Sequence, residues 1–175
     1  MRTLFDLFFD ICLLRRGPQD VPAAPALLRL CILAYLGTGF AALMAGVGAA
    51  YPLRSLLLTL ADLALLAGMT YSVLRALGHS TRLAQTLTAL TGCGTLLQLV
   101  ALPLGIWFDQ ASTTQANAEL PFILWLLLLL WSIVITAHIL RHAFTVSFGI
   151  GLAYAFAYLF VSWTVADWLL PLAST

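Results

Sequence analysis

The chain has 175 residues, of which 62% are hydrophobic and only 9% are charged, and its mean hydropathy is +1.02. These values lie outside the range of water-soluble folds. The formal net charge is +1 and every basic residue is an arginine, so the chain has no basic face extensive enough to hold a phosphate backbone, which excludes nucleic acid as an expected partner. The lipid bilayer is the expected surrounding, and the arginine-only basic residues in a Leu- and Ala-rich sequence indicate a bacterial source.

Residues 1–25 predict an amphipathic helix followed by a turn. Arg2, Asp6, Asp10 and Arg16 fall within one sector at helical spacing, and apolar residues fill the rest of the circumference. The segment is too short and too interrupted to cross a bilayer, so we expect it to lie in the membrane interface, with Arg2 and Asp6 able to pair. The following GPQDVPAAP contains three prolines and a glycine, which end the helix and turn the chain into the bilayer.

Residues 26–175 form the predicted membrane domain. Five apolar stretches are each long enough, at about 1.5 Å of rise per residue, to cross a hydrocarbon core about 30 Å thick. They cover approximately residues 26–50, 55–76, 83–107, 120–141 and 146–170. The fourth is the clearest, since it has no charge between Glu119 and Arg141. The predicted fold is therefore an all-α, polytopic bundle of five transmembrane helices, preceded by an interfacial amphipathic helix.

The distribution of arginines predicts how the bundle is oriented, because short cytoplasmic loops carry an excess of positive charge. All arginines except Arg54 fall on the same side of these five spans as the N-terminus. Trp107, Trp125 and Trp168 then gather at the opposite boundary, where indole rings prefer to lie. We therefore expect a protein of the bacterial inner membrane, with its N-terminus in the cytoplasm and its C-terminus in the periplasm.

Asp62 is the one acid that the predicted spans place within the hydrocarbon, where a charge costs roughly 3 kcal/mol. Counting helical rise places Gln98 of the third span and Ser162 of the fifth at a similar depth, and Thr95 shares the polar face of Gln98. We expect Asp62, Thr95, Gln98 and Ser162 to form a polar layer in the outer half of the bundle. We favour a carboxyl group that fixes helix register, protonated or bonded to Gln98, over a proton or cation site, because no second acid or buried base accompanies it.

The three histidines lie near the predicted cytoplasmic face, and His138 and His142 are one helical turn apart. With His79 as a third ligand the pair would suit zinc, but no Glu or Cys stands at a supporting spacing, so we favour capping or snorkelling roles over metal binding. The three cysteines have no metal-ligand spacing and are expected to pack as small apolar residues.

Signatures of catalysis are missing from the sequence. It contains no nucleophile elbow, phosphate-binding loop, zincin helix or paired-carboxylate site. We therefore expect no enzymatic activity and no cofactor.

The order of segments resembles that of the Yip family, the Ypt/Rab-interacting-protein-like membrane proteins. The resemblance is carried by the proline-bearing turn from Arg15 to Pro25, by AQTLTAL at Ala84 to Leu90 and by WSIVITAHILRHA at Trp131 to Ala143. It covers nearly the whole chain and implies a five-helix membrane organiser or interaction partner rather than a catalyst. The long N-terminal domain of the eukaryotic members is missing, so the resemblance does not imply a role with small GTPases.

Two hypotheses for function follow from the sequence. The leading one is an integral inner-membrane accessory or scaffold protein that binds other membrane proteins, or itself, through small-residue helix faces such as the one containing Gly46 and the one containing Gly151. The alternative is a small transporter or a proton- or cation-coupled membrane subunit that uses Asp62 and the Thr/Gln face of the third span. An enzyme or a haem-binding subunit that uses His138 and His142 ranks third.

Overall fold

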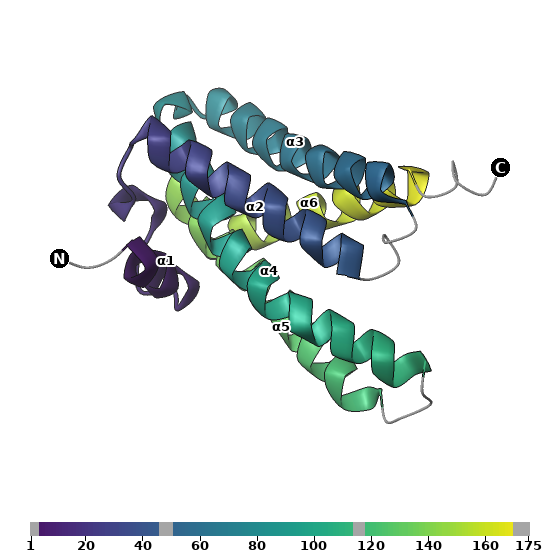
Figure 1. The fold of residues 1–175 in the computed structure, drawn as a ribbon. Coiled ribbons are helices and arrows are strands. Elements are labelled where there is room, and N and C mark those ends of the chain that lie inside the picture. Colours follow the sequence, from purple (N-terminus) through teal and green to yellow (C-terminus); the bar gives the residue numbers. More distant parts are fainter. Residues whose placement is uncertain (1–3, 46–50, 114–117, 170–175) are drawn as a thin grey trace.

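A computed structural model describes residues 4–45, 51–113 and 118–169, and within these ranges all regular structure is helical (Figure 1). Five of the described helices are long and apolar enough to cross a membrane, which confirms the all-α fold and the membrane-spanning character of the chain. These five are α2 (Pro25–Ala45), α3 (Pro52–Ala76), α4 (Leu83–Thr113), α5 (Glu119–Phe144) and α6 (Phe148–Leu169). The shorter elements are α1 (Leu4–Cys12) and the 3-10 turns η1 (Pro18–Asp20) and η3 (Ser80–Arg82).

The helix boundaries follow local chemistry. Pro25 and Pro52 occupy the first positions of α2 and α3, where the missing N–H is not needed. α4 continues to Thr113, beyond the end predicted near Trp107, because residues 108–113 contain neither Gly nor Pro. The hydroxyl of Ser112 also bonds the Phe108 carbonyl at 2.7 Å within this extension. The end predicted for the first span falls on residues 46–50, outside the described part of the chain.

α1 presents apolar side chains on two faces. Leu7, Phe8, Ile11 and Cys12 are buried in the core, and α1 contacts α4 and α5. Phe5 is 62% exposed, and Leu4 and Phe9 are exposed beside it. One face therefore fixes α1 to the bundle while the other is open to the bilayer, as an interfacial helix requires. The predicted pairing of Arg2 with Asp6 lies outside the described residues.

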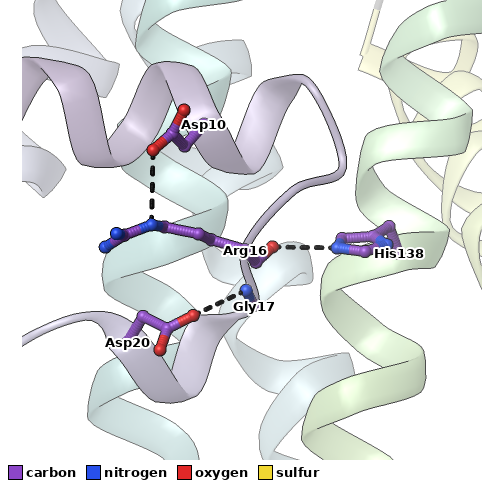
Figure 2. A network of polar contacts seen from close by, with 5 residues as sticks. All are labelled: Asp10, Arg16, Gly17, Asp20 and His138. Carbon is purple, nitrogen blue, oxygen red and sulfur yellow. Dashed lines mark hydrogen bonds and ion pairs between the residues drawn. The ribbon is translucent and has the colours of Figure 1, made fainter.

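A polar network ties the segment after α1 to α5, as Figure 2 shows. Asp10 forms an ion pair with Arg16 at 3.3 Å, and the Gly17 N–H donates to Asp20 Oδ2 at 3.1 Å. The ring of His138, which is buried, donates from Nε2 to the Arg16 carbonyl at 2.9 Å. His138 therefore holds the N-terminal segment against α5.

The long helices diverge away from the end where α1 packs. In Figure 1, α2, α3 and α6 run together, while the distal halves of α4 and α5 leave them as a separate helical hairpin. The core lies before this divergence, with Ile11, Leu74, Ile135 and Ile139 fully buried. Beyond it, large apolar residues of α5 are exposed, such as Leu120, Ile123 and Leu127. These faces would contact lipid or another membrane protein.

Candidate functional site

The carboxyl group of Asp62 accepts hydrogen bonds from two other helices. Tyr35 of α2 donates to Oδ2 at 2.6 Å. Tyr158 and Ser162 of α6 donate to Oδ1 at 2.5 Å and 2.9 Å. One side chain of α3 thus connects three helices, and we call these four residues the Asp62 cluster.

The pattern of α3 directs Asp62 inward. The buried residues of this helix share one mostly polar face and recur at spacings of four or seven: Ser55, Thr59, Leu66, Thr70 and Leu74. Asp62 stands in the same row. α3 begins at Pro52 rather than near Ser55, so Asp62 lies about 15 Å into the helix, closer to its middle than the outer-half position predicted from sequence.

The partners of Asp62 are positioned by helix periodicity and by a glycine. Tyr158 and Ser162 are four residues apart on α6 and therefore share one face. Tyr35 reaches the site because Gly94 of α4 leaves room for its ring. A Cβ atom at Gly94 would stand 2.6 Å from Tyr35 Cε2.

Two cavities meet at the Asp62 cluster. The first, which we call the Asp62 cavity, has a volume of about 290 Å³ and is lined by Asp62 and Ser162 together with apolar residues of α2, α3 and α6. The second, which we call the Ser132 cavity, has a volume of about 200 Å³ and is lined by Tyr35, Tyr158 and Ser132. Because the two tyrosine hydroxyls bond Asp62, the cluster stands between the cavities.

The structure brings three of the four predicted layer residues together. Ser162 bonds Asp62 directly, and Gln98 lines both cavities. The amide oxygen of Gln98 accepts a hydrogen bond from Thr38 at 2.5 Å, so its oxygen is engaged with α2 rather than with Asp62. Thr95 stays outside the cluster because its hydroxyl donates to the Thr91 carbonyl one turn earlier, at 2.8 Å.

Sequence reasoning did not identify the two tyrosines of the cluster. Tyr158 carried a signal, because it precedes Ser162 by one turn on the same face of α6. Tyr35 carried none, since one tyrosine in a largely apolar helix does not reveal its partner, and the packing of α2 on α3 and α4 places its hydroxyl beside Asp62.

The histidines considered as weak metal ligands make contacts with other parts of the chain. The rings of His138 and His142 meet edge to face, with centroids 4.7 Å apart. His142 Nε2 accepts a hydrogen bond from Arg141 Nε at 3.3 Å, while His79 precedes the turn η3. Within residues 4–45, 51–113 and 118–169, no three His, Cys, Asp or Glu side chains are arranged to hold a metal ion.

The cysteines are all reduced and buried. Cys12 of α1 and Cys93 of α4 lie within hydrogen-bonding range of each other, and this contact lowers the pKa of the Cys12 thiol while burial acts in the opposite direction. Their buried positions agree with the packing role expected for them, but the contact between Cys12 and Cys93 could not be read from their spacing.

No protein-family description matches this chain, and no curated protein or solved structure matches it either. The candidate site is therefore interpreted from its own geometry.

Proposed function

We propose that this chain is a small proton- or cation-coupled membrane protein, either a transporter or a subunit of one, in which Asp62 binds the ion. The observation that carries the proposal is the position of the Asp62 cluster between two cavities within a bundle of membrane-spanning helices. Acids inside a membrane are rare and commonly mark ion or proton pathways.

The hydrogen bonds of the cluster make the arrangement of helices sensitive to the charge on Asp62. Three hydroxyl donors on two oxygens suit an ionised carboxylate, which accepts hydrogen bonds but donates none. A protonated carboxyl group must donate, so at least one hydroxyl has to turn and accept instead. Protonation, or a cation in the Asp62 cavity, therefore weakens a contact that joins α3 to α2 or α6.

Further hydroxyls extend this polar row along the contact between α3 and α6. Thr70 of α3 and Tyr154 of α6 lie next to each other, one turn or more from the cluster. Both hydroxyl oxygens are buried and outside hydrogen-bonding geometry with any described group. The two hydroxyls face each other, so polar side chains continue along the contact between α3 and α6 beyond the cluster.

The competing interpretation, that Asp62 only fixes helix register, accounts for the three hydrogen bonds. It does not require one cavity at the carboxyl group and a second at its tyrosine partners, since a structural contact is most stable when it is tightly packed. The two cavities favour an ion site over a purely structural one.

The proposal is tested by reconstituting the purified protein into liposomes that enclose a pH-sensitive dye and then imposing a pH or sodium gradient. We expect Asp62→Asn to abolish ion flux while the variant stays monodisperse in detergent. Asp167→Asn is the matched control, because Asp167 is an exposed acid on α6. Unchanged flux in Asp62→Asn would refute the proposal.

A second proposal is that the chain acts as a membrane accessory protein through helix contacts. It is supported by the diverging α4–α5 hairpin and by Gly37 of α2, which is exposed and has no atom within 4 Å of its Cβ position. Gly151 does not serve this purpose, because its Cβ position stands 2.5 Å from the Ala137 carbonyl and it packs within the chain. Loss of a co-purifying subunit of fixed stoichiometry in Gly37→Leu would favour this function.

The location and family are also proposals. We place the chain in the bacterial inner membrane with its N-terminus in the cytoplasm, supported by the arginines near the ends of α3 and α5 and at the start of α4. A relationship to the Yip family is supported by the order of a short helix, a proline-bearing turn and five long helices.

A further inference from the structure

A third cavity lies at the opposite end of the fold from the hairpin tip, where η1 meets the start of α4 and the end of α5. Its volume is about 280 Å³. Among the residues that the structure describes, Arg82 and His142 line it and no acidic residue does; the other lining residues are Pro18, Gln19, Gln85, Thr86 and Ala143. Asp20, the acid of η1, accepts the Gly17 N–H and lies outside the lining. Arg82 is therefore the charged side chain of this described lining, and the charge of Asp20 acts on His142 from outside it.

Hydrogen-bond donors remain available in this lining. One guanidinium nitrogen of Arg82 donates to the Ala143 carbonyl at 3.4 Å, which leaves most of its five N–H groups for a ligand. Nε2 of His142 accepts from Arg141, so the neutral ring carries its proton on Nδ1 and can donate from there.

The wall of the cavity is fixed in place by a side chain of α4. Gln85 Nε2 donates to the Val21 carbonyl at 3.0 Å, and Val21 is buried directly after η1. The N-terminal segment is also bound to α5 through His138, as Figure 2 shows. The cavity is thus formed by ordered groups from three parts of the chain.

The depth of the cavity corresponds to the headgroup region of a bilayer. α5 has 26 residues and is therefore about 39 Å long, which exceeds a hydrocarbon core of about 30 Å. Its last turn, which contains His142, extends past the acyl chains. The first turn of α4 and the last turn of α5 both lie at this end of the fold, so their opposite helix dipoles offset each other and Arg82 sets the charge of the cavity.

We propose that this cavity binds a phosphate group, with Arg82 as the main ligand and His142 as a second donor. Arginine is suited to this role because its planar fork of N–H groups matches phosphate oxygens. The phosphate can belong to an anionic phospholipid headgroup or to free inorganic phosphate. This site is separate from the Asp62 cluster and does not depend on the function proposed for it.

The test uses the full-length protein purified in detergent and exchanged into phosphate-free buffer. Binding of dioctanoyl phosphatidylglycerol and of inorganic phosphate is measured separately by calorimetry and native mass spectrometry. We expect Arg82→Gln to weaken binding at least ten-fold and Arg75→Gln to leave it unchanged, since Arg75 is an exposed arginine of α3 outside the cavity lining. His142→Gln, which leaves the Arg82 contact to Ala143 intact, should weaken binding by a smaller factor.

Each outcome has a defined meaning. Binding of the lipid but not of inorganic phosphate identifies a headgroup site, and binding of both with equal sensitivity to Arg82→Gln identifies a site for the free anion. Equal binding to wild type and Arg82→Gln, or equal losses in Arg82→Gln and Arg75→Gln, overturns the proposal. If Arg82→Gln fails to fold, the separate variants His142→Gln and Arg82→Lys are measured instead. Arg82→Lys keeps the positive charge but loses the planar fork of N–H groups. Undiminished binding by both variants overturns the proposal as well.

Discussion

Two tyrosines on the same face of α6 differ in what their hydroxyls do. Tyr158 donates to Asp62, whereas the buried hydroxyl of Tyr154 makes no hydrogen bond to a described group. We expect Tyr158→Phe to lower the free energy of unfolding by about 1 kcal/mol, the usual scale for a hydrogen bond between membrane helices. Tyr154→Phe removes the same atom beside Thr70, where the two hydroxyls lie outside good hydrogen-bond geometry, so its loss of stability should be smaller. Unfolding in detergent measures both variants. Equal losses of stability would show that the hydrogen bond from Tyr158 to Asp62 does not stabilise the fold.

Side chains of the Asp62 cluster differ in how far sequence could predict them. Asp62 and Ser162 could be predicted because an acid in an apolar helix needs partners at its own depth. Thr95 differs because a threonine inside a helix can satisfy its hydroxyl on the carbonyl four residues earlier, so its polarity did not require a partner from another helix. Tyr35 could not be found, since its role depends on how closely α2 approaches α4 at Gly94.

At the scale of elements, the packing of α1 against α4 requires the space that Gly92 leaves for the Phe8 side chain. A Cβ atom at Gly92 would stand 2.4 Å from Cε1 of Phe8, which is buried. We expect Gly92→Leu to displace α1, and amide exchange of residues 4–12 should accelerate at least ten-fold while that of α4 changes little. Gly68→Leu is the control, because a Cβ atom at Gly68 of α3 meets nothing within 4 Å. Unchanged protection of α1 in Gly92→Leu would mean that Phe8 does not anchor it.

The positions of the long helices were predictable, and their packing was not. Apolar length locates a membrane helix regardless of its neighbours, so all five long helices were placed correctly, with differences at their ends. α4 ran past its predicted end because an interfacial segment without Gly or Pro can continue a helix into the polar region. The sequence positions of Gly92 and Gly94 in α4 did not indicate which side chains would pack against them.

At the scale of the whole molecule, the divergence of the α4–α5 hairpin from α2, α3 and α6 was beyond prediction (Figure 1). Hydrophobic periodicity distinguishes protein-facing from water-facing residues, but lipid and protein interior are both apolar, so in a membrane it carries little information on which helices touch. The polar residues are the exception. Asp62 and Ser162 were expected to meet because burial without a partner is costly there.

The orientation of the molecule can be tested with its own surface residues. Ser80 is exposed at the arginine-rich end, and Ser112 is exposed near the far end of α4. If the arginines mark the cytoplasmic side, a membrane-impermeant maleimide added to intact spheroplasts should label Ser112→Cys and leave Ser80→Cys unlabelled until the membrane is opened. The wild-type protein serves as the background, because its three cysteines are buried. The reverse labelling pattern would invert the topology and place the third cavity, lined by Arg82 and His142, on the outer face. A phosphate ligand would then have to come from the outer leaflet or the periplasm.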